Sequence, residues 1–285
     1  VWFTKSDSTA KSRLLNLGCG ERHHSSWTNV DFKSSNPAVI SYDLRKGLPF
    51  EPNSYDALYQ SHLLEHFSKN YAPIFLKQCY RVLKPGGIIR VVVPDLECIV
   101  RLYLNLLKKS LKGDKEAQKR YDWIMLEFFD QMVRNHSGGA MLDYWHQKPM
   151  PAEDFVIERL GSEVKDAIAK IHSNPNLKNQ PCRQADVTLD PLEIGQFRLS
   201  GEIHQWMYDR YSLSKMLQEA GFVDITTCCA DESHIPNFNS YLLDIELDGS
   251  IRKPDSLFIE ARKPDELSTK ILYTPDASQN KPLIA

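Results

Sequence analysis

Residues 13–94 alternate short apolar runs with chain breakers, and this rhythm constrains the fold more than any other feature of the sequence. The last run, GIIRVVVP at 87–94, has the composition of a strand that is covered on both faces. Just before it, apolar residues of 70–83 share one helical face, and Pro85-Gly86-Gly87 ends that helix. Strand, helix and strand in this order predict a parallel sheet with right-handed crossovers. Earlier strands are predicted at 13–17, 28–32, 38–44 and 55–60.

The rest of the chain is predicted to form first a group of helices and then two further strands of the sheet. Between 95 and 172 three stretches each place their apolar residues on one helical face. A helix at 211–221 and strands at 222–230 and 256–263 follow. We therefore predict one α/β domain over 13–265, with a helical cap inserted at about 95–200 and terminal tails at 1–12 and 266–285.

Composition excludes several kinds of partner. The formal net charge is −2, which gives no sign of a nucleic-acid or membrane-surface footprint. No apolar run approaches the roughly 20 residues that a membrane-spanning helix needs. The first residues lack the pattern of a signal peptide, and the six cysteines show no CxxC spacing. We therefore expect a cytoplasmic protein with reduced thiols.

The first strand runs into Gly18-Cys19-Gly20, a turn whose glycines let a ligand lie against the main chain. The dinucleotide fingerprint would require a third glycine where His23 stands, and a phosphate-binding GxxxxGK[ST] motif is absent. Taken alone, the turn could merely reverse the chain.

Polar residues also follow the next three strands. Asp31 ends the second, Asp43-Leu44 the third and Ser61-His62 the fourth. The carboxyl ends of parallel strands form the edge at which open α/β sheets bind their ligands. The sequence therefore predicts a binding site at this edge.

Three stretches in order carry a family resemblance: LLNLGCG, YDLRKGLPFEPNSYDALYQSHLLEHF and FLKQCYRVLKPGGIIRVVVPD. They resemble the successive motifs of class I S-adenosylmethionine-dependent methyltransferases, in the branch with LEH after strand four and LKPGG before strand five. The resemblance covers 13–95 well and 201–262 more loosely. It implies a Rossmann-like fold with a seven-stranded, mostly parallel sheet, an antiparallel last strand and helices on both faces.

The resemblance also implies a cofactor, S-adenosyl-L-methionine, and the residues that hold it. Gly18, Cys19 and Gly20 would lie against its methionyl part, and Asp31 would accept hydrogen bonds from the ribose hydroxyls. The adenine would lie between Asp43 and Leu44, and Ser61 and His62 would close the pocket. One departure is that Gly20 and Asp31 are only eleven residues apart, where the family usually fits a full helix.

Catalytic candidates follow from the chemistry of methyl transfer. A sulfonium methyl is already activated, so an enzyme mainly places the acceptor and, for a hydroxyl, removes its proton. Asp95 follows strand five, His204 precedes the last helix, and His66 follows strand four. Asp95 could instead cap a helix, His204 could belong to a hydrophobic plug, and His66 could serve packing or a salt bridge.

Aromatic residues near these positions are candidates for acceptor binding. Trp206 and Tyr208 share the segment of His204, whereas Tyr144 and His146 lie in an expected loop after Gly138-Gly139. No histidine or cysteine spacing typical of a metal site occurs, and we expect none; a divalent ion at Asp95 is a minor alternative.

The predicted function is methyl transfer to a small polar acceptor, an oxygen on a sugar or secondary metabolite, because a helical cap suits an enclosed pocket. Alternatives are a methyltransferase that acts on a protein or other macromolecule and a non-catalytic cofactor-binding module. A dehydrogenase is disfavoured by His23. The apolar faces around Phe128 and Val164 leave a homodimer open.

Overall fold

The computed structural model describes residues 12–173 and 190–265, so both predicted tails lie outside the described residues apart from residue 12. Its centre is a seven-stranded sheet in the order β3-β2-β1-β4-β5-β7-β6. Every neighbouring pair from β3 to β5 is parallel, and β7 is antiparallel to both β5 and β6. This confirms the predicted mixed sheet. The strands are β1 (Leu14–Leu17), β2 (Trp27–Asp31), β3 (Val39–Ser41), β4 (Tyr55–Ser61), β5 (Leu83–Pro94), β6 (Val223–Cys228) and β7 (Ser256–Arg262).

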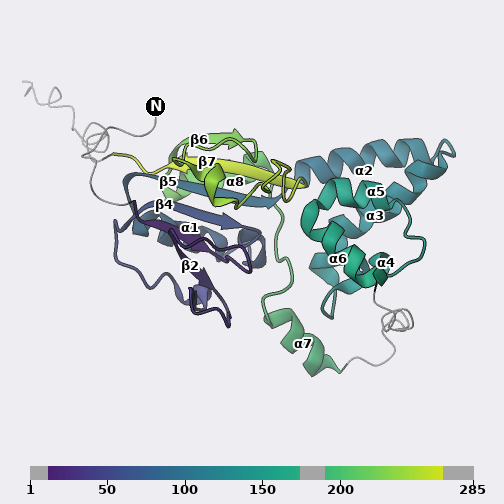
Figure 1. Cartoon of the computed structure of the whole chain (residues 1–285), viewed down its shortest axis with the longest axis horizontal. Helices are drawn as coiled ribbons and strands as arrows, with labels where there is room; N and C mark the ends of the chain where they lie inside the picture. Colours follow the sequence, from purple (N-terminus) through teal and green to yellow (C-terminus); the bar gives the residue numbers. More distant parts are fainter. Residues whose placement is uncertain (1–11, 174–189, 266–285) are drawn as a thin grey trace, which may run out of the picture.

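Two helices, α1 (Ala72–Val82) and α8 (Arg210–Ala220), pack side by side against one face of this sheet (Figure 1). Phe75 and Leu76 of α1 and Leu213 and Leu217 of α8 are fully buried in this layer. Gly221 ends α8 with a left-handed backbone, as its position after the apolar periodicity predicts. The Asp209 carboxylate accepts from the Ser212 amide and so caps the start of α8, and the Ser212 hydroxyl accepts from the Asp209 amide.

The opposite face differs from the expectation of helices on both sides. It is covered by the segment between β6 and β7, which contains only the short 3-10 helix η4 (Phe238–Tyr241). Phe238 of η4 packs against Trp27 and Tyr59 from the sheet. The reason lies in the chain connections: β1 joins β2 without a helix, and the chain after β5 leaves the sheet for the helical insertion.

Arg90 in the middle of β5 ties this segment to the sheet. Its fully buried guanidinium donates to Asp244 at 2.7 Å and to Glu260 at 2.9 Å. It also donates to the backbone carbonyls of Cys229, Ala230 and Glu232. Because both carboxylates are buried, the guanidinium supplies the charge that makes their burial tolerable.

The insertion forms a helical subdomain with a core of its own. Its helices are α2 (Leu96–Ser110), α3 (Lys115–Val133), α4 (Gly139–Trp145), α5 (Glu153–Leu160) and α6 (Ser162–Ser173), followed by α7 (Pro191–Leu199). Buried Trp123, Ile124, Val156 and Ile168 make the centre of that core. The subdomain lies beyond the end of β5, and α7 lies apart from it next to the segment that returns to the sheet (Figure 1).

The subdomain meets the sheet domain at a few polar contacts. Ser162 at the start of α6 donates to Glu246 at 2.8 Å, and Arg252 pairs with Glu163 at 2.9 Å. Gly161 comes so close to the carbonyl of Arg252 that an added Cβ would lie 2.1 Å from its oxygen. These contacts place the first turn of α6 over the edge of the sheet. None of the helices in the described ranges has the length and apolar character needed to traverse a bilayer.

Replacing Arg90 with Met should lower the free energy of unfolding by about 3–5 kcal/mol, because Asp244 and Glu260 would remain buried without a cation. Urea denaturation followed by circular dichroism measures the change. Arg101→Met is the matched control, since Arg101 is an exposed residue of α2 that pairs with Glu97, and it should cost about 1 kcal/mol or less. Equal denaturation midpoints for the two variants would contradict this account.

Candidate cofactor and acceptor site

The glycine turn follows β1 and is held against β2. The amides of Gly18 and Cys19 both donate to the carbonyl of Val30, at 2.8 and 3.2 Å. Gly18 and Gly20 have φ angles of +65° and +51°, in the left-handed region that glycine adopts without strain. A Cβ on Gly18 would lie 2.9 Å from Leu63. The turn therefore needs glycine at residue 18 for both conformation and space.

Asp31 stabilises the same turn. Its Oδ2 accepts a hydrogen bond from the Gly20 amide at 2.7 Å. This contact explains how eleven residues can join Gly20 to the end of β2 without a helix, since the carboxylate closes the connection directly. No other hydrogen bond to a described residue engages the carboxylate, so Oδ1 can accept from a ligand.

A cavity of about 490 Å³ opens on one side of the turn. Five residues predicted to bind the cofactor line it: Gly18, Asp31, Asp43, Leu44 and His62. The opposite wall comes from the end of α7 and the segment behind it, residues 198–202. The structure thus brings the ends of β1, β2 and β4 and the chain after β3 to one cavity.

The carboxylate of Asp43 is already engaged within this wall. Arg45 donates to both of its oxygens, at 2.9 and 3.1 Å, and these hydrogen bonds lower the pKa of Asp43. Asp43 also caps the short helix η1 (Leu44–Lys46) through the Arg45 amide. Its expected role beside the adenine stays a prediction.

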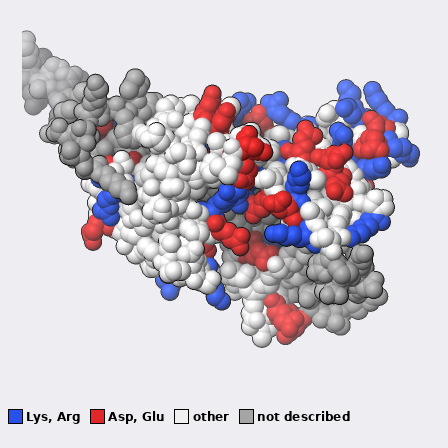
Figure 2. Space-filling model, in the orientation of Figure 1, with Lys and Arg blue, Asp and Glu red and all other residues white. Residues whose placement is uncertain are grey.

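A second cavity, of about 350 Å³, lies on the other side of the turn. The remaining predicted cofactor residues, Cys19, Gly20 and Ser61, line it, and Gly18 and His62 line both cavities. Its far wall holds Arg22, Glu163, Arg252 and Lys253. In Figure 2, acidic and basic side chains lie side by side where the sheet meets the helical insertion.

Lys253 is the unusual member of this wall. Its ammonium group makes no hydrogen bond or ion pair with any residue of 12–173 or 190–265, and burial lowers its pKa. Arg252 next to it pairs with Glu163, and Arg22 pairs with Glu246. An unpaired cation at the wall of a cavity suits a ligand that carries oxygen acceptors or negative charge.

His62, where the cavities meet, adopts a φ of +50°, which is uncommon for a residue with a side chain. Its Nε2 lies 2.8 Å from the hydroxyl of Ser256, and its Nδ1 lies 3.6 Å from Glu65 Oε1. Burial lowers the pKa of His62 well below the usual value, so the ring is neutral near pH 7.

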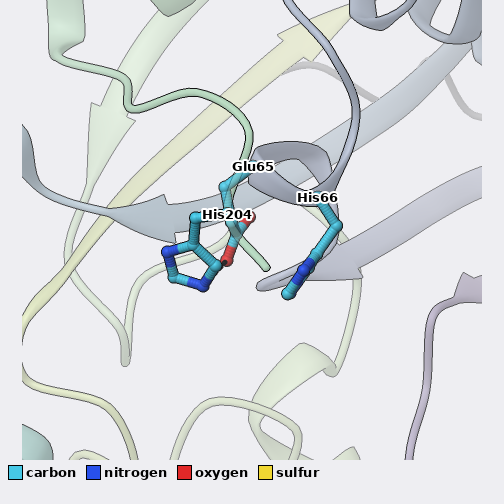
Figure 3. Close-up of side chains that lie close together, drawn as sticks. All are labelled: Glu65, His66 and His204. Atoms are coloured by element: carbon cyan, nitrogen blue, oxygen red, sulfur yellow. Dashed lines mark ion pairs between the residues drawn. The ribbon is translucent and has the colours of Figure 1, made fainter. Parts of the chain in front are cut away.

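Two of the predicted catalytic residues lie together, with a third group that the sequence analysis did not select. The rings of His66 and His204 meet edge to face with centroids 4.9 Å apart, and His204 Nε2 lies 3.9 Å from Glu65 Oε1. Figure 3 shows Glu65 and His66 on the turn after β4 and His204 approaching from the segment before α8. His66 lines the larger cavity, whereas Glu65 and His204 are buried behind it.

Asp95 lies apart from this group. Its Oδ1 accepts from the Cys98 amide at 3.1 Å and caps α2, which is the alternative that its sequence position also allowed. It lines a different cavity, with Glu97, Arg101 and Arg210. The structure does not bring it to the glycine turn.

The predicted acceptor-binding aromatics line neither cavity at the turn. The expected loop around Tyr144 is wrong: Tyr144 belongs to α4, where its hydroxyl donates to the Pro151 carbonyl at 2.8 Å, and His146 caps the helix end. Trp206 packs on the sheet core with the Lys69 ammonium over its ring, and Tyr208 is fully buried. The helical spacing of apolar residues from Gly139 onward is the signal that could have predicted α4 in place of a loop.

The sequence analysis missed Glu65, Arg22, Arg252 and Lys253. Glu65 stood within the quoted LEH motif, so a signal existed for it. Arg252 and Lys253 come from the far end of the chain, and no local pattern relates them to the glycine turn. Only the path of the segment between β6 and β7 brings them there.

Part of the chain resembles a known protein family. Residues 21–91 match the model of a family described as a methyltransferase domain, from just after the glycine turn into β5. Over that segment the match supports the predicted resemblance to class I S-adenosylmethionine-dependent methyltransferases. The cofactor of this family is S-adenosyl-L-methionine. A comparison with curated proteins gives no match.

Solved structures similar to this chain include a putative methyltransferase in complex with the Haloferax volcanii Trm112 activator (10% identity, 90% of this chain and 83% of that chain, TM-score 0.36). A SAM-dependent methyltransferase from Archaeoglobus fulgidus is also similar (12% identity, 88% and 86% covered, TM-score 0.37). So is the 1,6-didemethyltoxoflavin-N1-methyltransferase of Burkholderia thailandensis (11% identity, 89% and 72% covered, TM-score 0.37).

Gly18→Ala should weaken binding of S-adenosylhomocysteine at least tenfold, because the new Cβ meets Leu63 and forces the turn to move. Isothermal titration calorimetry measures the dissociation constant. Gly113→Ala is the matched control: Gly113 also has a positive φ, +88°, but has open space around it and lies between α2 and α3. Both variants should lose about 1–2 kcal/mol of stability from backbone strain. An unchanged dissociation constant in Gly18→Ala would contradict the assignment of the turn.

Asp31→Asn should weaken the same binding by about 10- to 100-fold, since a hydrogen bond to a charged group contributes about 1.5–3 kcal/mol. The amide preserves the shape of the side chain, so the fold should survive; calorimetry gives the affinity and thermal unfolding checks the fold. Asp56→Asn, in the partly exposed pair with Lys84, serves as control and should bind normally. Equal affinities would remove Asp31 from the cofactor site.

Proposed function

We propose that this methyltransferase transfers a methyl group from S-adenosyl-L-methionine to an oxygen atom of a small polar acceptor. The cofactor would occupy the cavity of about 490 Å³ and the acceptor the cavity of about 350 Å³. The observation that carries the proposal is that the two cavities meet at Gly18 and His62. A methyl donor in one and an acceptor in the other would be adjacent only there.

The residues of the larger cavity fit the cofactor. The bare main chain at Gly18 leaves room beside Leu63, and Oδ1 of Asp31 is available to accept from a ribose hydroxyl. When bound, the cofactor supplies an electrophilic methyl group on a sulfonium. The work of the protein is then to hold the acceptor in line and to exclude water.

The smaller cavity favours a small acceptor. Its volume falls within the roughly 300–1,000 Å³ of typical small-molecule sites. The first turn of α6 and the Arg252-Lys253 segment close its far side. Lys253 and the arginines there would bind the oxygens of a hydroxylated or anionic molecule. These features support a sugar or an oxygen-rich metabolite over a macromolecule.

A hydroxyl acceptor must lose its proton during transfer. His62 is the titratable side chain common to both cavities, so its imidazole is the group placed to accept this proton. His66 lines the cofactor cavity, and His204 lies behind it, so both stay candidates to act with His62. A direct role for Asp95 finds no support in its position.

The test combines calorimetry with transfer of a labelled methyl group. S-adenosylhomocysteine should bind with one site per chain, and label should pass to members of a panel of monosaccharides and phenols. Label that enters only added protein or RNA would overturn the small-acceptor proposal. Failure to bind S-adenosylhomocysteine would overturn the cofactor site itself.

Lys253→Met should leave the affinity for S-adenosylhomocysteine within about twofold but reduce methyl transfer at low acceptor concentration about tenfold or more, through loss of a charge-assisted hydrogen bond. Steady-state kinetics on the acceptor identified by the panel give KM and kcat. Lys165→Met, an exposed lysine on α6, is the control and should behave as the unaltered protein. A lower cofactor affinity with unchanged acceptor KM would place Lys253 in the cofactor site instead.

A further inference from the structure

We propose that Glu65, His66 and His204 form a binding site for a divalent transition-metal ion, typified by Zn²⁺, behind the wall of the cofactor cavity. Glu65 and His66 come from the short helix η2 (Leu64–His66), and His204 comes from the segment between α7 and α8. This inference goes beyond the proposed methyl transfer and does not depend on it. It also departs from the expectation from sequence that the chain holds no metal.

The geometry of the three side chains suits one ion. One ligand atom from each lies within 4.8 Å of the others, and Figure 3 shows the three side chains close together. Ligands about 2.1 Å from a tetrahedral zinc lie roughly 3.4 Å apart, so side-chain movements of about 1 Å would complete the coordination. Such movements are within the reach of rotamer adjustments.

Glu65 supplies the observation that points to a ligand. Its side chain is 1% exposed, and neither carboxyl oxygen has a hydrogen-bond partner among the described residues. The buried hydroxyl of nearby Tyr208 also lacks a hydrogen-bond partner among the described residues. Buried polar groups without partners commonly mark a missing water or ion. A bound cation would compensate the negative charge of the buried Glu65 carboxylate.

The histidines present the form that binds metals. His66 Nδ1 lies 3.1 Å from the carbonyl of Ile203 and donates to it, which leaves the Nε2 lone pair free. His204 is buried, and its Nε2 lies 3.9 Å from Glu65 Oε1. Metal ligation requires neutral imidazole, and the hydrogen bond to Ile203 is the outer contact that usually orients such a ligand.

The ligand set selects the class of ion. Two imidazoles and one carboxylate suit Zn²⁺ and other transition metals, whereas Mg²⁺ and Ca²⁺ prefer all-oxygen sites. Three protein ligands leave a position for water or a substrate oxygen, which is typical of catalytic rather than structural zinc sites. His66 lines the cofactor cavity, so this position can open toward it.

Calorimetric titration of the metal-free full chain with Zn²⁺ and Co²⁺ tests the site. One ion per chain should bind, and Glu65→Gln, His66→Gln and His204→Gln should each weaken the affinity about 100-fold or more, beyond the 10- to 100-fold effect of an outer contact. His136→Gln is the matched control, because His136 lies between α3 and α4 and its one hydrogen bond among the described residues is to the Ser137 carbonyl. Its affinity should be unchanged.

The Co²⁺ spectrum of the unaltered protein gives a second readout that survives if a variant fails to fold. Coordination by nitrogen and oxygen should give visible bands without the thiolate charge-transfer band that ligation by Cys228 or Cys229 would produce. Circular dichroism and thermal unfolding check each variant. The proposal is overturned by absence of stoichiometric binding, by a thiolate spectrum, by preference for Mg²⁺, or by equal affinity in folded ligand variants.

Discussion

One buried guanidinium determines how the second face of this sheet is closed. Arg90 binds Asp244 and Glu260 together with backbone carbonyls at 229, 230 and 232, and thereby fixes the segment that takes the place of helices on that face. The same segment continues to Arg252 and Lys253, which form the far wall of the smaller cavity. The acceptor side of the proposed site thus depends on a charge network in the middle of β5 rather than on the methyltransferase motifs.

The glycine turn is held by hydrogen bonds where the family usually has a helix. In place of a full helix between β1 and β2, Asp31 accepts from the Gly20 amide, and Val30 accepts from Gly18 and Cys19. The carboxylate therefore shapes the turn and, in the proposed function, also binds the cofactor ribose. A short connection leaves the space above the turn free of a helix, and Arg22 and Glu246 meet there.

The sequence predicted the parts of the structure that local patterns encode. Apolar runs and their breakers identified all seven strands, and the glycine turn and strand ends identified eight residues that line the two cavities. The prediction of helices on both faces was wrong because apolar strands show only that a face of the sheet is covered. They do not show whether a helix or a loop covers it. Lys253 and the pairing of Glu65 with His204 escaped because tertiary contacts between distant segments create them. The loop predicted at Tyr144 failed because two glycines suggested irregular structure where Gly138 instead caps α4.

Buried charged groups are satisfied around Arg90 but unsatisfied beside the two cavities. Arg90, Asp244 and Glu260 are as inaccessible as Glu65, yet they satisfy one another, as a network that stabilises a fold must. The Glu65 carboxylate and the Tyr208 hydroxyl are buried without hydrogen-bond partners among the described residues, none of which pairs with Lys253. Unsatisfied groups destabilise the free protein, so their concentration beside the cavities favours a site completed by ligands. Arg90 neutralises the buried carboxylates of its network from within the chain. By the same argument, a bound cation would neutralise the charge of Glu65, and an oxygen-rich acceptor would pair with the ammonium group of Lys253.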